Sequence, residues 1–238
     1  MALKQLEKSM GNMIELKSAD GTLVPAYEAR PAGTPKGAVV VIQEIFGVNS
    51  HIRNVADGYA AEGYVAIAPA MFHRVKPGVE LGYAEADMGE GFGYKTAIEA
   101  LPAPGAMPDI QAAIDHAAKT SGGKVGIVGY CWGGLLTWRS ACTLKGLSAA
   151  VPYYGGGVTT DAETARQPRV PVMAHFAEED KWIPLDSVEA FKNAHPEVQV
   201  FTYAAHHGFN CDQRGAWHAP SAQLARERTL AFFKQHLS

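Results

Sequence analysis

The chain has 238 residues and a formal net charge of −3, with no block of like charges. This length is enough to bury a sizeable core, and the balanced charge argues against a nucleic-acid or membrane-surface partner. No apolar run reaches the roughly 18 residues of a membrane-spanning helix. The polar, charged segment 1–12 does not resemble a secretory signal.

The three cysteines, Cys131, Cys142 and Cys211, are odd in number and widely spaced. A small secreted domain held by disulfides would show an even, closely spaced set. We therefore expect no disulfide framework and a reducing, cytoplasmic setting.

Strand and helix patterns alternate along the chain after an opening hairpin. Residues 13–17 and 23–29 alternate in polarity around Ala19-Asp20-Gly21, which is typical of two antiparallel strands. Apolar runs predict strands at 38–42, 64–68, 125–129, 149–154, 172–176 and 198–203. Helical spacing predicts helices at 49–62, 109–119, 135–144, 186–194 and 220–236. This order predicts a single α/β domain over 1–238, with a mostly parallel, doubly wound sheet and an antiparallel N-terminal edge hairpin.

Residues 70–108 interrupt this alternation. The segment is rich in glycine and proline, and only 80–101 has any helical character. A long, weakly patterned stretch inside a compact domain is often a lid or a substrate-binding excursion. A segment that only packs on the domain is the alternative.

The most informative stretch is Val125 to Gly134, in which an apolar strand runs into Gly129-Tyr130-Cys131-Trp132-Gly133. This is the G-x-S-x-G nucleophile elbow of α/β-hydrolases with cysteine in the serine position. The sharp strand-to-helix turn is strained and needs small neighbours. It directs the next backbone N–H, that of Trp132, toward the nucleophile at a helix N-terminus, where the dipole favours negative charge. Cys131 is therefore the candidate nucleophile.

An acid and a histidine follow the elbow in the chain order of α/β-hydrolases. Asp180 comes after the strand at 172–176, and His207 comes after the strand at 198–203 and precedes a glycine. Both should lie at the carboxyl edge of the sheet, where such folds build their sites. Glu178 and Glu179 remain alternative acids, and His206 remains an alternative base.

A further carboxylate follows the strand at 38–42, in Gln43-Glu44-Ile45-Phe46-Gly47. An α/β-hydrolase places its second oxyanion donor here, which would be the amide of Ile45. Glu44 would then lie beside the nucleophile, and burial makes a carboxylate a stronger proton acceptor. Glu44 is a candidate to accept the thiol proton or to hold the resting thiol. The alternative is a structural ion pair with an arginine or lysine.

The remaining histidines are interpreted as structural, with His51 in a loop or at a helix end and His175 in the core. A metal site is conceivable from a set near the C-terminus: His206, His207, Cys211, Asp212 and His218. Their spacing matches no common zinc pattern, so we expect neither a metal nor a cofactor.

Together these motifs resemble the dienelactone hydrolase family over nearly the whole chain. The resemblance rests on 43–49, 126–134, the Asp180 loop and 207–209, with a weaker match at 227–230. It implies an α/β-hydrolase fold and a Cys131–His207–Asp180 triad. It also implies that Glu44 is the activating glutamate, which substrate binding moves toward the thiol so that the cysteine stays neutral until then.

The sequence differs from the family at the residues that bind the substrate. Members that act on dienelactone hold its carboxylate with two arginines, one in the mid-chain excursion and one just after the histidine. Here no arginine lies between Arg74 and Arg139, and the position four after His207 is Cys211. Arg74 and Arg214 are the remaining candidates for substrate binding.

The expected activity is hydrolysis of a small-molecule ester or enol-lactone through a thioester acyl-enzyme, with Ile45 and Trp132 as oxyanion donors. A general carboxylesterase or thioesterase, and a non-catalytic thiol-redox sensor on the same fold, are the alternatives. The expected assembly is a monomer or small homo-oligomer.

Overall fold

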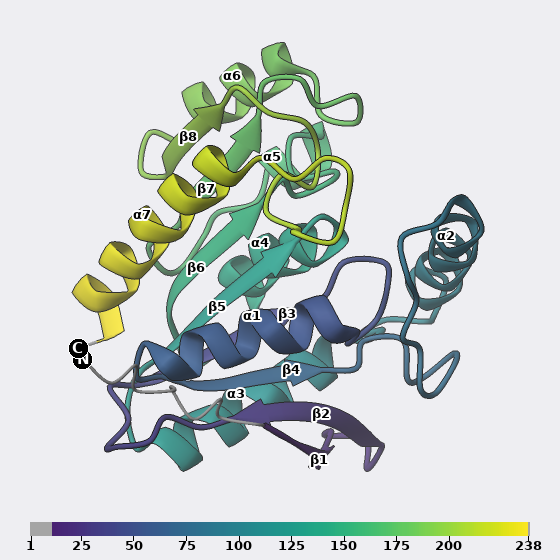
Figure 1. The fold of residues 1–238 in the computed structure, drawn as a ribbon, viewed down its shortest axis with the longest axis vertical. Helices are drawn as coiled ribbons and strands as arrows, with labels where there is room; N and C mark the ends of the chain where they lie inside the picture. The colour runs from purple at the N-terminus through teal and green to yellow at the C-terminus, as the bar shows by residue number, and fades with distance from the viewer. Residues whose placement is uncertain (1–10, 238) are drawn as a thin grey trace, which may run out of the picture.

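A computed structural model describes residues 11–237 of the chain as a mixed eight-stranded sheet covered by helices (Figure 1). The strand order is β1-β2-β4-β3-β5-β6-β7-β8. In chain order the strands are β1 Asn12–Lys17, β2 Leu23–Ala29, β3 Ala38–Ile42, β4 Val65–Pro69, β5 Val125–Tyr130, β6 Leu147–Tyr153, β7 Met173–Ala177 and β8 Gln199–Tyr203. Strand β2 is antiparallel to its neighbours β1 and β4. The other neighbouring pairs, in the order β4-β3-β5-β6-β7-β8, are all parallel. The predicted fold class and edge hairpin are confirmed.

The helices cover both faces of this sheet. They are α1 Ser50–Ala61, α2 Glu85–Glu99, α3 Met107–Ser121, α4 Trp132–Thr143, α5 Asp161–Thr164, α6 Leu185–Ala194 and α7 Ala219–Leu237. In Figure 1, α1 and α7 lie in front of the sheet, and α3 and α4 lie behind it. Helix α4 begins directly after the elbow, at the helix N-terminus expected for Trp132, whereas the short α5 was not predicted.

The central strands explain the continuous apolar runs of the sequence. Every residue of β3, β4 and β5 is buried, since helices cover both faces of the parallel part of the sheet. Parallel strands end at one common edge. The loops after β3, β5, β7 and β8 therefore meet there, and these are the loops that carry the predicted site residues.

The irregular segment 70–108 contains α2, which stands at the edge of the molecule (Figure 1). Only Gly91 and Ile98 of this helix are buried, so it has almost no apolar stripe. The helical character predicted within 80–101 is confirmed. Its weak sequence pattern follows from how little of the helix is buried.

His175 confirms its interpretation as a core residue. Its ring is fully buried, with Nδ1 2.8 Å from the hydroxyl of Tyr203 and Nε2 3.0 Å from Oγ1 of Thr229. Burial, together with the nearby Arg228 cation, lowers the pKa of His175 to about 3. The imidazole is therefore a neutral, hydrogen-bonded part of the core.

Candidate active site

The elbow places Cys131 in a strained turn between β5 and α4. Its backbone has φ 55° and ψ −117°, a region that residues with a side chain rarely adopt. A Cβ at Gly129 would lie 2.1 Å from the carbonyl oxygen of Gly133, and one at Gly133 would lie 2.4 Å from that of Gln43. Both glycines of the motif are thus required by close backbone contacts. Trp132 is the first residue of α4, so its N–H has no partner within the helix.

Asp180 and His207 meet at the carboxyl edge of the sheet. Oδ2 of Asp180 lies 2.7 Å from Nδ1 of His207, and the Asp180 side chain is fully buried. Its other oxygen, Oδ1, accepts hydrogen bonds from the backbone N–H groups of Trp182 (2.8 Å) and Ile183 (3.2 Å). The carboxylate is therefore fixed in position and leaves one oxygen for the imidazole.

The alternative acids and base have other partners. Glu178 accepts a hydrogen bond from the hydroxyl of Thr202 at 2.9 Å. Glu179 lies 3.3 Å from His206, and both side chains are exposed. Of the candidates considered, only Asp180 and His207 form a buried carboxylate–imidazole pair.

His207 and Cys131 line the same cavity, and the two side chains interact electrostatically. Burial alone lowers the pKa of the imidazole, but the negative charge of a Cys131 thiolate and the contact with Asp180 raise it by more, to about 10. The geometry thus couples the thiol to the imidazole and the imidazole to a carboxylate.

This coupling can be measured. Replacing Cys131 with alanine removes the largest contribution that raises the His207 pKa, so this pKa is expected to fall from about 10. Below its pKa the imidazole is protonated, so the variant should lose the proton at a lower pH than the unmodified protein. An NMR titration of the His207 ring tests this, with Cys142→Ala as the control. An unchanged pKa in Cys131→Ala would show that the thiol and the ring are not coupled.

Glu44 lies behind the elbow and is almost completely buried. Its Oε1 accepts a hydrogen bond from Nη1 of Arg214 at 3.1 Å, and its Oε2 has no partner among residues 11–237. The Arg214 guanidinium also lies 5.5 Å from the ring centroid of Phe46. Glu44 therefore forms an ion pair, the alternative considered from the sequence, while one carboxylate oxygen stays unpaired in the interior.

A cavity of about 310 Å³ opens over Cys131. Four other predicted site residues line it: Ile45, Trp132, His207 and Arg214. Met88, Phe92 and Lys95 of α2 form part of its wall, as does Trp182 from the loop after β7. The cavity thus combines an apolar, aromatic wall with two cations beside the thiol.

The structure corrects the placement of Arg74, which does not line this cavity. Its guanidinium forms two hydrogen bonds to the carboxylate of Asp109, at 2.7 and 2.6 Å, and a third to Asp20 at 2.6 Å. The Asp109 side chain is buried, and a buried carboxylate requires a partner of opposite charge. Arg74 fulfils this structural role away from the cavity.

Several residues of the site were missed by the sequence analysis, among them Lys95 and Gln43. Lys95 lies in the weakly patterned segment and binds Glu99 at 2.7 Å, and Glu99 accepts a hydrogen bond from the indole N–H of Trp132. Gln43 accepts from the backbone N–H of Met71 and donates to the carbonyl of Glu44, so it holds the loop after β3. The only sequence signal for Gln43 was its place beside Glu44.

A family model described as the dienelactone hydrolase family matches residues 24–237. The chain belongs to the dienelactone hydrolase family. It is 36% identical over 242 aligned residues to a relative from Escherichia coli K12 named "putative carboxymethylenebutenolidase", covering 92% of this chain and 84% of that one. It is 34% identical over 227 residues to the carboxymethylenebutenolidase of Pseudomonas putida, covering 92% and 94% of the two chains.

A crystal structure of a "putative dienelactone hydrolase" from Klebsiella pneumoniae has the same fold, with a TM-score of 0.81 and 31% identity over 94% of this chain and 98% of that one. This dienelactone hydrolase family member is thus an α/β-hydrolase that acts on lactone or ester bonds. Within residues 11–237, no helix combines the length and the apolar character needed to cross a membrane.

Proposed function

We propose that this dienelactone hydrolase family member cleaves esters or enol-lactones with Cys131 as the nucleophile. The observation that carries the proposal is that Cys131 and His207 line one cavity, with His207 paired to the buried Asp180. The cavity is large enough for a small molecule. A nucleophile, a base and an orienting acid are the parts that acyl transfer requires.

The first half-reaction forms a thioester. The Cys131 thiolate attacks the carbonyl carbon, and the N–H groups of Ile45 and Trp132 stabilise the oxyanion. The C–O bond then breaks, and His207 donates its proton to the departing alkoxide or enolate. A stable leaving group favours this direction, because thiolate is otherwise expelled again.

The second half-reaction releases the acid. His207, now neutral, takes a proton from water as the water oxygen attacks the thioester carbon. The C–S bond breaks and the sulfur leaves as a thiolate, which then takes back the proton that Glu44 accepted from the thiol. Asp180 keeps the imidazole in the orientation that both proton transfers need.

Glu44 and Arg214 provide a way to couple substrate binding to thiol activation. In the resting arrangement Arg214 pairs with Oε1 of Glu44 and also lines the substrate cavity. An anionic group on the substrate competes with Glu44 for this guanidinium. A released Glu44 can then accept the thiol proton, so activation follows binding.

The cavity wall defines a substrate class. Phe92, Trp132 and Trp182 supply aromatic surface, and Arg214 and Lys95 supply positive charge near the same space. These features suit a small, partly apolar lactone or aryl ester that carries a carboxylate.

Acyl trapping tests this function. The protein is mixed with a panel of enol-lactones, aryl esters and acyl-thioesters, each with and without a carboxylate, and quenched in acid. Mass spectrometry of the peptides should locate the acyl group on Cys131, and the anionic lactones and esters should react fastest. Burial raises the pKa of Cys142 to about 11 and that of Cys211 to about 12, so these thiols serve as internal controls. Acylation of either one in place of Cys131, or turnover of thioesters alone, would contradict the proposal.

A further inference from the structure

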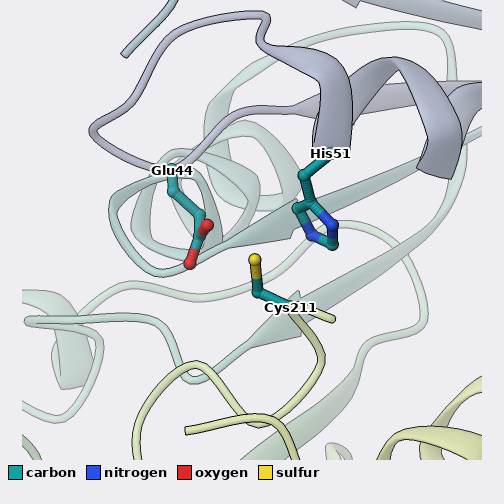
Figure 2. Close-up of side chains that lie close together, drawn as sticks. All are labelled: Glu44, His51 and Cys211. Atoms are coloured by element: carbon teal, nitrogen blue, oxygen red, sulfur yellow. The ribbon is translucent and has the colours of Figure 1, made fainter. Parts of the chain in front are cut away.

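Three side chains that can bind a metal, and that do not line the substrate cavity, lie close together in the interior (Figure 2). Glu44 after β3, His51 at the start of α1 and Cys211 after β8 each direct one ligand atom toward a common point. These three atoms, a carboxylate oxygen, a ring nitrogen and a sulfur, lie within 4.8 Å of one another. All three residues are at most 3% exposed, so the cluster is part of the interior. His51 was expected in a loop or at a helix end; it lies in the first turn of α1 and is buried there.

Two atoms of this cluster are unsatisfied. Oε2 of Glu44 and Nε2 of His51 are buried without a hydrogen-bond partner among residues 11–237. Leaving such a group unpaired destabilises the folded protein, and the effect is larger when the group is charged. The two orphaned atoms therefore favour a ligand that both of them can bind.

The surroundings of His51 and Cys211 favour a cation. Nδ1 of His51 lies 3.1 Å from the carboxylate of Asp212, which holds the ring proton on Nδ1 and leaves the Nε2 lone pair free. A carboxylate behind a histidine is the usual outer partner of a metal-binding imidazole. The hydroxyl of Tyr83, which accepts a hydrogen bond from Asn49 at 3.1 Å, acts against the effect of burial and lowers the pKa of Cys211, which favours a thiolate.

We propose that Glu44, His51 and Cys211 form a binding site for a thiophilic divalent ion of the Zn²⁺ class. Sulfur, imidazole nitrogen and carboxylate oxygen are the ligands that Zn²⁺ selects, and three protein ligands leave its fourth position open. Tetrahedral bonds of about 2.0–2.3 Å place ligand atoms about 3.3–3.5 Å apart. Atoms that now lie within 4.8 Å of one another would therefore have to approach by about 1.5 Å at most. These three ligands differ from the metal-binding set considered from the sequence. The two sets share only Cys211.

The charges balance on binding. The Glu44 carboxylate and a Cys211 thiolate together carry two negative charges, which a divalent ion neutralises. Arg214 and Asp212, on either side, offset each other. The metal–sulfur bond forms as the Cys211 S–H bond breaks, and the proton passes to water without any electron transfer.

A second cavity lies beside His51, outside the substrate cavity. His51 and Asp212 line a separate cavity of about 390 Å³, together with Tyr59, Trp217 and residues of α7. Cys131 and His207 line the other cavity. The cavity beside His51 is thus separate from the one that contains the nucleophile.

Occupation of the site would restrain Glu44. Its unpaired oxygen would be bound to the ion, so the carboxylate could not move to accept the thiol proton of Cys131. Zn²⁺ should then slow turnover without binding to Cys131. This consequence depends on the proposed function of Glu44, whereas the binding itself does not.

Cobalt binding tests the site directly. Co²⁺ is titrated into the full chain under anaerobic, reducing conditions, and the thiolate-to-cobalt absorption is recorded; Zn²⁺ should displace the cobalt. We expect one ion and one released proton per chain. The signal should persist in Cys131→Ser and Cys142→Ser. It should be lost in Cys211→Ser, with binding weakened more than about 100-fold, since loss of an outer partner alone costs about 10–100-fold.

The variant Asp212→Asn is a second test, in case Cys211→Ser loses metal binding only because it does not fold. The Asp212 side chain is 58% exposed, so its replacement should leave the fold intact. We expect metal binding to weaken by about 10–100-fold in this variant. Absorption that survives in Cys211→Ser, disappears in Cys131→Ser, or is absent from the unmodified protein at stoichiometric Co²⁺ would overturn the site. Binding without inhibition would support the site and would contradict its effect on Glu44.

Discussion

Replacing Cys131 with alanine is expected to lower kcat/KM for an enol-lactone or aryl ester by at least about 10⁴-fold. Alanine lacks an atom that can form the covalent bond, while the oxyanion donors and the cavity remain. Only binding and electrostatic stabilisation would then act on attack by water. The residual rate should therefore exceed the uncatalysed rate, yet lie far below that of the unmodified protein.

The measurement is steady-state hydrolysis of a chromogenic aryl ester and of an enol-lactone by matched proteins. Cys142→Ala is the control, because Cys142 is a buried thiol of α4 outside the substrate cavity. Circular dichroism should show that both variants keep the fold. If Cys131→Ala retained the rate of the control, the nucleophile would have to be another group, and the thioester mechanism would be excluded.

Glu44→Gln is expected to lower kcat/KM by about 10²–10³-fold, within the range for the loss of a general base. Glutamine preserves the size of the side chain and can still accept a hydrogen bond from Arg214. It cannot take up the thiol proton. The loss should therefore appear mainly in the acylation step, which a stopped-flow measurement of the first turnover reports.

Arg214→Gln separates this role from a purely structural one. The substitution breaks the same ion pair but leaves the Glu44 carboxylate in place. Acylation by a neutral ester should then fall far less than in Glu44→Gln, whereas anionic substrates should lose affinity. If the two variants were equally impaired on the neutral ester, Glu44 would serve only to position Arg214.

The sequence alone predicted the sheet, the elbow and the order of the candidate triad, because each of these depends on local physics. Continuous apolar runs report strands that are covered on both faces. The glycines at 129 and 133 report backbone contacts too close for a Cβ. Asp180 and His207 could be found because parallel strands end at one edge, so each loop after a strand is a candidate position.

Only the tertiary structure showed which charged side chains form ion pairs and which of them line the cavity. Arg74 looked close to the site in sequence, but the buried Asp109 holds it elsewhere, and Lys95 lines the cavity from a helix whose pattern was weak. Glu44 and His51 are near one another in the sequence, but Cys211 joins them from the loop after β8, and no local spacing indicates that the three side chains meet. Steric limits and apolar periodicity act over a few neighbouring residues, so the sequence shows them directly. Contacts between distant side chains depend on the paths of the loops that connect the strands and helices. The nucleophile elbow could therefore be identified from the sequence, and the groups that surround it could be placed only in the folded chain.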